Sequence, residues 1–227
     1  MKPLKCIRIL SFLTLSLFAL ISHAQDDTAD RLAKSDAEQE KKATEWIDGL
    51  QLSDKAKEDR LQMVISRHLK AVRNWHNSHP FTEVPAGINP ATGNKLSELD
   101  RQMIADSAMP AEVHQQLMVG LRKDLTEPQV SMILDKYTVG KVAFTTKGYE
   151  AIVADLTAKE REIIKQNLEQ AREQAVDYKS MKQISAIFEI YKTKIEQYFN
   201  ANGRNWHQLF KTYVDGVKAK KAKDKKS

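Results

Sequence analysis

Apolar residues recur at helical spacing along most of the chain, and no long stretch alternates as a strand does. One segment carries an apolar row at steps of four and three: Ile164, Leu168, Ala171, Ala175 and Tyr178. The next segment repeats the spacing with Ile184, Phe188, Tyr191, Ile195 and Tyr198. Two such rows, joined by a short turn around 179–180, predict two antiparallel helices. The pattern as a whole predicts an all-α fold, an antiparallel multi-helix bundle with short connections.

Residues that start and stop helices mark several boundaries. Thr126 and Thr157 each precede Gln or Glu by three positions, which is the capping-box pattern at a helix start. Ser53 is expected to cap an earlier helix, and Pro110 is expected to break or kink a later one. Gly203 is placed to end the helix that contains 184–198.

The helical pattern is interrupted by a long loop at about 77–95. This segment holds Pro80, Pro85, Gly87, Pro90 and Gly93. Loops of this length are uncommon inside a compact domain and are often functional. A tolerated insertion is the alternative, and both interpretations stay open.

The N-terminus has the features of a secretory signal peptide, residues 1–24. Lys2, Lys5 and Arg8 precede an apolar run at 9–21, and Ser22-His23-Ala24 follows as a cleavage site. The run is too short to span a membrane, and a buried N-terminal helix is the less favoured alternative. We therefore expect cleavage after Ala24, a periplasmic or secreted protein, and one helical domain over 25–217.

The net charge of +6 overstates how basic the folded part is. The signal peptide carries +3 and the Lys-rich segment 218–227 carries +5, so subtracting both leaves −2 for residues 25–217. A nucleic-acid partner is therefore not expected. The Lys-rich segment is expected to be a disordered tail, with contact to anionic lipid or acidic polysaccharide as the alternative.

No sequence motif indicates an enzyme. The only cysteine, Cys6, lies in the signal peptide, which leaves the mature chain without disulfides, cysteine-ligated zinc or a cysteine nucleophile. Glycine-rich phosphate loops and nucleophile elbows are missing. His76 and His79 lack a partner ligand nearby in sequence, so we predict no metal site and no cofactor.

Aromatic residues together with hydrogen-bonding side chains suggest a ligand site. Sugars present apolar faces and hydroxyl edges, which proteins meet with flat aromatic rings and with forked donors and acceptors. Residues of these types are Trp75, Tyr149, Tyr191, Trp206, Arg172, Lys192 and Asn200. Aromatic residues at helical spacing are also common in cores, which is the alternative interpretation.

Several stretches of the C-terminal half resemble a known family. They are 125–129 (LTEPQ), 137–142 (YTVGKV), 156–157, 169–175 (EQAREQA) and 188–203 (FEIYKTKIEQYFNANG). They are similar to the family of exported bacterial proteins called domain of unknown function 3826, over roughly residues 40–210. The resemblance implies an exported, all-helical, sugar-binding protein. The positions it offers for a site are Thr138, Lys141, Tyr149, Arg172, Tyr191, Lys192 and Asn200. Thr193-Lys194 and Glu196-Gln197 depart from the family pattern, as does the 77–95 loop.

Three functional hypotheses follow. The first is a carbohydrate-binding or accessory protein of extracytoplasmic polysaccharide use, with Arg172 and Lys192 as donors to an oligosaccharide. The second is a periplasmic chaperone of the Spy and CpxP type, whose short motif resembles Leu125-Thr126-Xaa-Xaa-Gln129. The third is a glycan-active enzyme whose acid and base lie among Glu169, Glu173 and Asp177.

Overall fold

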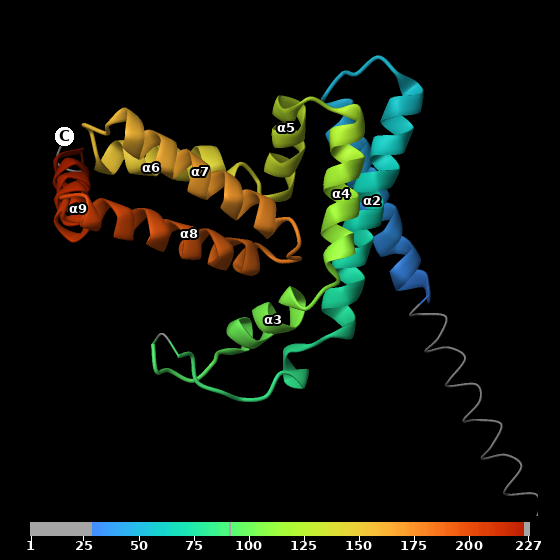
Figure 1. The fold of residues 1–227 in the computed structure, drawn as a ribbon, viewed down its shortest axis with the longest axis horizontal. Helices are drawn as coiled ribbons and strands as arrows, with labels where there is room; N and C mark the ends of the chain where they lie inside the picture. The colour runs from blue at the N-terminus through green and yellow to red at the C-terminus, as the bar shows by residue number, and fades with distance from the viewer. Residues whose placement is uncertain (1–28, 91, 225–227) are drawn as a thin grey trace, which may run out of the picture. The chain divides into compact units, whose positions relative to one another are not determined.

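The computed structural model describes residues 29–90 and 92–224, and these residues are helical apart from their connections (Figure 1). Within these ranges the only strand-like pairing is an isolated bridge between Ile88 and Lys95. The all-α fold is thus confirmed. The expected signal peptide lies outside the described residues. None of the described helices is both long enough and apolar enough to cross a bilayer.

The chain divides into two compact units, and the boundary lies between Ser66 and Arg67, inside α2 (Lys55–Ser78). The expectation of one domain over 25–217 stays a prediction. In the first unit, a helix over 29–48 is followed by a turn and then by the start of α2. Ala43, Ile47, Leu61 and Ile65 of this unit are buried.

Ser53 does not cap α2, contrary to the sequence prediction. Its φ of +56° is left-handed, whereas a capping residue needs an extended backbone. The carboxylate of Asp54 takes this role, because its Oδ1 accepts the backbone N–H of Lys57 at 3.0 Å.

The second unit contains the remaining helices in sequence order. They are η1 (Phe81–Glu83), α3 (Glu98–Ser107), α4 (Ala111–Asp124), α5 (Glu127–Tyr137), α6 (Lys141–Ile152), α7 (Ala158–Ala175), α8 (Met181–Ala201) and α9 (Trp206–Asp224). Pro110 separates α3 from α4, as predicted. Both predicted capping boxes are present, at the start of α5 and of α7. Gly203, with a φ of +86°, follows the end of α8.

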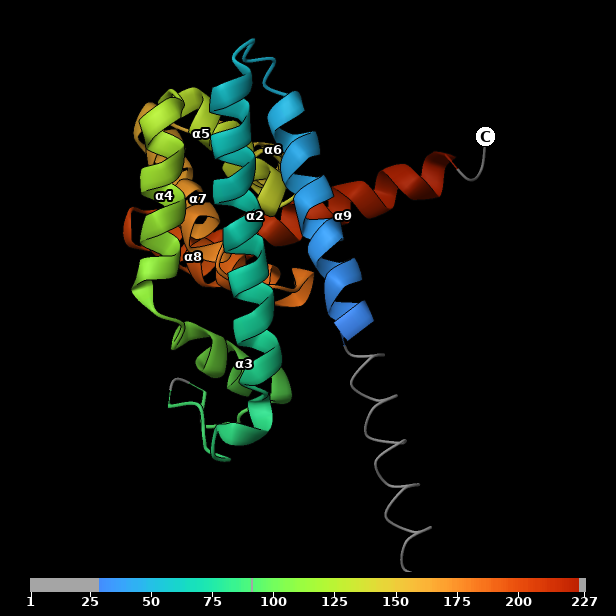
Figure 2. The ribbon, with the colours of Figure 1, turned by 90° about the vertical axis from the view of Figure 1, so that its right-hand side faces the viewer.

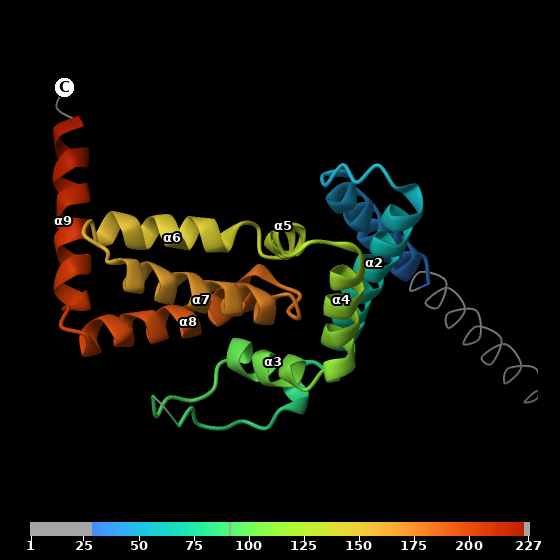
Figure 3. The ribbon, with the colours of Figure 1, turned by 45° about the horizontal axis from the view of Figure 1, so that its top comes forward.

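Helices α7 and α8 form the predicted antiparallel pair, and α6 lies along α7 (Figures 1 and 3). The predicted apolar row of α7 is buried, as are Ile184, Phe188 and Ile195 of α8. Tyr191 and Tyr198 are only partly buried. α9 crosses the end of this group and adds Trp206 and Leu209 to its core (Figure 3).

α9 continues through part of the segment that was expected to be disordered. Residues 218–224 are helical, while 225–227 are outside the described residues. Lysine and alanine are good helix formers, and lysines near a helix C-terminus interact favourably with its dipole. Both effects favour extending a helix that has already been nucleated by the packing of Trp206.

The predicted loop is present and is fastened to α3 (Figure 2). The Phe81 N–H donates to Gln102 Oε1 at 2.8 Å, and the Arg101 guanidinium donates to the Val84 carbonyl with Nε at 2.8 Å. Arg101 also lies over the Phe81 ring, 5.4 Å from its centroid. These contacts hold the first part of the loop against α3.

Candidate functional site

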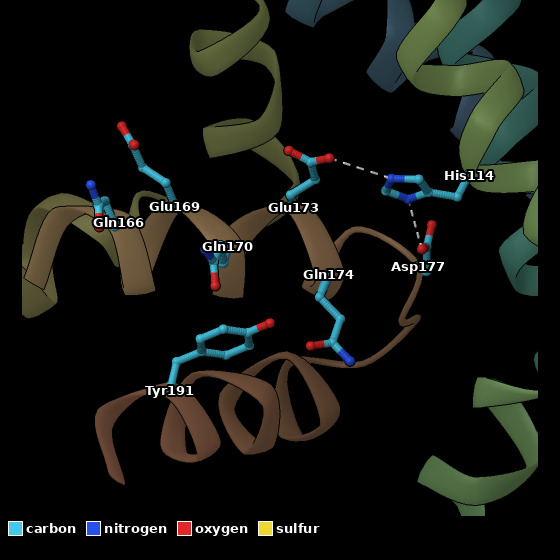
Figure 4. Close-up of a pocket in the computed structure, with 8 residues that line it drawn as sticks. All are labelled: His114, Gln166, Glu169, Gln170, Glu173, Gln174, Asp177 and Tyr191. Carbon is cyan, nitrogen blue, oxygen red and sulfur yellow. Dashed lines mark hydrogen bonds and ion pairs between the residues drawn. The ribbon is translucent and has the colours of Figure 1, made fainter. Parts of the chain in front are cut away.

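A groove of about 640 Å³ runs along α7 between α4 and α8 (Figure 4). It lies wholly within the second unit. Each residue that lines it carries a polar group: His114, Gln166, Glu169, Gln170, Glu173, Gln174, Asp177 and Tyr191.

Two rows of polar side chains, on α7 and the turn that follows it, make one wall of the groove. Residues four apart lie on the same face of a helix, about 6 Å apart along its axis. The amides of Gln166, Gln170 and Gln174 have this spacing, and we call them the amide row. The carboxylates of Glu169, Glu173 and Asp177 have it too, and we call them the acid row. The groove therefore offers repeated hydrogen-bonding groups along a line.

The two rows face different helices. Figure 4 shows Gln170 and Gln174 directed toward Tyr191 of α8, whereas Glu173 and Asp177 are directed toward His114 of α4. Lys194 Nζ lies 4.2 Å from the centroid of the Tyr191 ring. Tyr191 thus brings an aromatic ring and a hydroxyl to the amide side, and His114 brings an imidazole to the acid side.

Asp177 accepts hydrogen bonds from two histidines of distant helices. Its Oδ2 lies 2.8 Å from His114 Nδ1, and its Oδ1 lies 3.0 Å from His68 Nε2 in α2. The second nitrogen of His114, Nε2, lies 3.8 Å from Glu173 Oε1. A histidine held at one nitrogen by a carboxylate has a defined orientation, and its other nitrogen remains available for proton transfer or for a ligand.

His68 is buried beside Asp177. It is 3% exposed, its ring meets that of Tyr137 edge-on at 5.4 Å, and its Nδ1 has no hydrogen-bond partner among the described residues. The hydrogen bond between Nε2 and Asp177 therefore links a buried ring of α2 to the border of the groove.

The charges of this cluster shift the acidity of its members. Burial acts to raise the pKa of Asp177, but the hydrogen bonds from His114 and His68 outweigh it and leave that pKa below its ordinary value. The hydrogen bond to Asp177 raises the pKa of His114, with Glu173 adding to the effect. The cluster thus combines an ionised carboxylate with a histidine that holds its proton more tightly than usual.

A smaller pocket of about 160 Å³ adjoins the groove and shares His114, Gln174 and Asp177 with it. Asp106 and Tyr178 also line this pocket. Asp106 is buried, and its carboxylate accepts from His76 at 2.7 Å, from Gln102 at 2.9 Å and from Gln183. His114 and Asp177 therefore stand where two pockets meet.

The match to a protein family covers this whole region. The family model described as "Protein of unknown function (DUF3826)" matches residues 36–219. The chain belongs to this family. A comparison with curated proteins found no match.

The DUF3826 match confirms the resemblance given by the sequence, and the structure now places each candidate residue. Tyr191 is the one member of the predicted ligand set that lines the groove. Glu169, Glu173 and Asp177, considered above as an acid and base, line it as well. The groove thus contains one of the predicted ligand residues and all three of the acidic residues considered for catalysis.

Arg172 lies elsewhere and has a structural role. Its side chain is buried, and its Nη1 lies 3.0 Å from Asp135 Oδ1 while Nη2 lies 3.0 Å from Ser131 Oγ. These contacts join α7 to α5. Lys192 pairs with Glu189 at 2.9 Å, on its own helix. Neither cation is among the residues that line the groove.

The remaining aromatic candidates are packing residues. Tyr149 is 2% exposed, with Trp206 at 5.3 Å between ring centroids. Burial raises the pKa of Tyr149 well above its usual range. Trp75 donates from Nε1 to the Ala105 carbonyl at 3.1 Å and stacks on His79 at 3.7 Å.

The polar candidates Asn200, Lys141 and Thr138 also have internal roles. Asn200 Oδ1 accepts the Trp206 N–H at 2.9 Å, which starts α9. Lys141 Nζ lies 5.8 Å from the centroid of the Phe188 ring. Thr138 is fully buried, and its hydroxyl donates to the Leu134 carbonyl at 3.3 Å.

Sequence reasoning missed His114 and the amide row as groove residues. The spacing of Gln166, Gln170 and Gln174 was visible in the sequence, since three glutamines recur at four-residue steps on one helix. His114 had no such signal. Its partner Asp177 lies 63 residues away, and only the fold brings the two together.

Proposed function

We propose that the chain binds an oligosaccharide in the α7 groove and acts as a carbohydrate-binding or accessory protein in extracytoplasmic polysaccharide use. The observation that carries this proposal is that the amide row, the acid row and Tyr191 line the same groove. Export rests on the N-terminal sequence pattern alone and is part of the proposal.

The lining has the chemistry that sugar hydroxyls require. A hydroxyl both donates and accepts, an amide side chain does the same with separate atoms, and a carboxylate accepts. The exposed amides of Gln166, Gln170 and Gln174 and the partly exposed Glu169 and Glu173 supply both kinds of group. The Tyr191 ring supplies an apolar surface for the C–H face of a sugar ring.

The regular spacing of the two rows favours a linear ligand. Each row repeats at about 6 Å along α7, so equivalent groups meet a chain at successive positions. A single small metabolite would need convergent groups in a closed pocket instead.

The proposed donors differ from those expected from the sequence. Arg172 is occupied by Asp135 and Ser131, and Lys192 by Glu189. In the groove, the amides, the Tyr191 hydroxyl and His114 take their place as donors. Since the charged lining residues other than His114 are carboxylates, a uronate-rich ligand is disfavoured.

Thermal unfolding against a panel of oligosaccharides tests the proposal. A ligand at ten times its Kd stabilises the folded state by about 1.4 kcal/mol, which raises Tm by roughly 3–6 °C for a chain of this size. We expect the shift for one class of neutral glycan.

A matched pair of variants locates the binding site. Gln170→Leu and Tyr191→Ala should each weaken binding of the responding glycan by tenfold or more in calorimetry, since each removes a group that faces the groove. Gln208→Leu, an exposed glutamine of α9 that bonds Thr212, should bind as the unmodified protein does. Equal binding by all three variants would place the ligand outside the groove.

A second candidate is a glycan-active enzyme. It is favoured by His114, whose Nδ1 is held by Asp177 while its Nε2 faces Glu173, because this arrangement suits proton transfer. Product analysis after incubation with the bound glycan distinguishes the two functions. Cleavage that is lost in His114→Gln, with binding retained, would establish the enzyme.

The chaperone hypothesis gains no support from the groove. A surface that holds unfolded clients exposes a contiguous apolar area. The groove is lined by amides, carboxylates, a histidine and a single aromatic residue, Tyr191.

A further inference from the structure

The exposed face of α9 carries an apolar row. Phe210, Tyr213 and Val217 follow one another by three and four residues, and their exposed fractions are 48%, 38% and 36%. This spacing puts them on one face of the helix. The row continues the face of Trp206, which lies against the core with its ring 5.8 Å from that of Phe199.

The C-terminal half of α9 has no described helix of its unit packed against it. Figures 2 and 3 show the C-terminal half of α9 extending away from the other helices of its unit. Every residue over 215–224 is exposed. Trp206 therefore anchors the helix, and the apolar row beyond it faces solvent.

Most lysines of α9 follow this row, toward the C-terminal end of the helix. α9 carries Lys211, Lys218, Lys220, Lys221 and Lys223 against two aspartates, which makes it +3, and two further lysines follow in the sequence. Lys220 and Lys221 come three and four residues after Val217, so they lie one turn further along the same face, at the C-terminal end of the row. Long lysine side chains in such positions can keep their ammonium groups in water while their stems lie against an apolar layer.

We propose that α9 is a docking helix for an anionic phospholipid surface. Its apolar row enters the interface between headgroups and acyl chains, and its lysines contact the phosphates. Tyr213 suits that boundary, because it combines an apolar ring with a polar tip. The proposal is independent of the glycan groove, which involves no residue of α9.

The combination of features favours a membrane over two other occupants. A soluble polyanion would be met by the lysines but would make no use of the apolar row. A second protein chain would bury about 800 Å² of each partner, and the cores of such interfaces are depleted in lysine. The row on α9 is narrow, and four lysines of the same helix follow it directly.

Vesicle flotation tests the proposal. The full chain is produced with export, and the recovered protein is mixed with vesicles of phosphatidylglycerol and phosphatidylcholine, or of phosphatidylcholine alone. We expect binding to the anionic vesicles that weakens as salt is added, because the lysine contribution is screened. Equal binding to both kinds of vesicle would overturn the proposal.

Two variants separate the apolar and the charged contributions. The first replaces Phe210, Tyr213 and Val217 by serine, and its control replaces three exposed apolar residues on other helices: Val119, Phe144 and Ile190. The second replaces Lys218, Lys220, Lys221 and Lys223 by glutamine, and its control replaces Lys147, Lys159, Lys165 and Lys182. All variants share the same N-terminus, so any contribution from that segment cancels.

Each α9 variant should lose about tenfold in vesicle affinity, and each control should retain the affinity of the unmodified protein. Circular dichroism checks that all variants remain folded, which we expect because the substituted α9 residues lie at the surface. Controls that lose as much as the α9 variants would overturn the proposal. So would a concentration-dependent dimer that disappears in the first α9 variant, because the row would then meet a second copy.

Discussion

His114 Nδ1 lies 2.8 Å from Asp177 Oδ2, and this hydrogen bond joins α4 to the turn that follows α7. The other oxygen of Asp177 is bonded to His68, which is buried in α2. One carboxylate therefore sets the position of the imidazole that borders the groove. Changes at Asp177 should consequently affect both stability and the groove.

Asp177→Asn should lower the free energy of unfolding by about 1–3 kcal/mol at neutral pH. The amide keeps the size of the side chain, but its NH2 group faces a histidine donor and leaves one hydrogen bond unmade. Urea unfolding measures the difference. Asp215→Asn is the control, because Asp215 forms only an exposed pair with Lys211 at 3.8 Å and should change stability by less than about 0.5 kcal/mol. Equal losses would mean that the cluster contributes no more than a surface pair.

His114 should make stability depend on pH near neutrality. Its folded pKa is raised above the ordinary histidine value of 6.5 by the hydrogen bond to Asp177, so protonated His114 favours the folded state. This contribution is fully present below about pH 6.5 and is lost as pH rises through the folded pKa. The stability difference between the unmodified protein and His114→Gln should therefore be larger in mild acid than in mild alkali.

Urea unfolding across that range measures this difference, and NMR titration of the imidazole reports the pKa of His114 directly. A titration midpoint at or below the value of an ordinary histidine would contradict the prediction. In Asp177→Asn the midpoint should move down, because the principal cause of the raised pKa is then removed.

Glu160 and Arg204 should control stability in acid. Arg204 Nε lies 2.6 Å from Glu160 Oε1, and this hydrogen bond is the main reason that the pKa of Glu160 falls from 4.5 to about 2. The ion pair therefore contributes stability above about pH 4.5 that is lost as pH falls toward 2. Glu160→Gln keeps the capping box of α7 but removes the charge, so it should destabilise the protein at neutral pH and lose this acid dependence.

Urea unfolding at several acidic pH values tests the Glu160 prediction. Glu150→Gln is the control, since Glu150 pairs with Arg161 at 2.7 Å but both side chains are about half exposed. Surface pairs of that kind contribute little. If both variants show the same dependence of unfolding free energy on pH, the partly buried pair of Glu160 and Arg204 contributes no more than an exposed pair.

Arg172→Met should reduce stability without changing glycan affinity. The substitution removes hydrogen bonds to Asp135 and Ser131, and it should cost about 1–2 kcal/mol because Asp135 can still reach water. Arg172→Lys should restore only part of the loss, because lysine has no planar fork for two acceptors. Calorimetry on the folded variants then measures affinity, and a specific loss of binding would return Arg172 to the ligand site.

Helical periodicity identified the α7–α8 pair because the spacing of apolar residues along one helix face is a local property of the sequence. Ile164 and Leu168 are buried as their spacing predicts. The capping boxes at Thr126 and Thr157 were equally visible, since capping involves residues three positions apart. Proline and glycine marked the long loop for the same local reason.

Residue type alone does not show where the candidate ligand residues lie in the fold. Arg172, Tyr149 and Trp206 have the chemistry of a sugar site, yet each packs against other elements of the fold. Whether a polar or aromatic side chain faces a groove or a neighbouring helix depends on what packs beside it. That neighbour is set by the tertiary structure.

The sequence by itself determined the helical class, the α7–α8 pair, the capping boxes at Thr126 and Thr157 and the family. These features depend on residues within one or two turns of each other. Only the tertiary structure decided that the rows line a groove, that Tyr191 borders it and that His114 meets Asp177. The two histidines lie 63 and 109 residues from Asp177, and such distant contacts follow from how whole helices pack rather than from any local pattern.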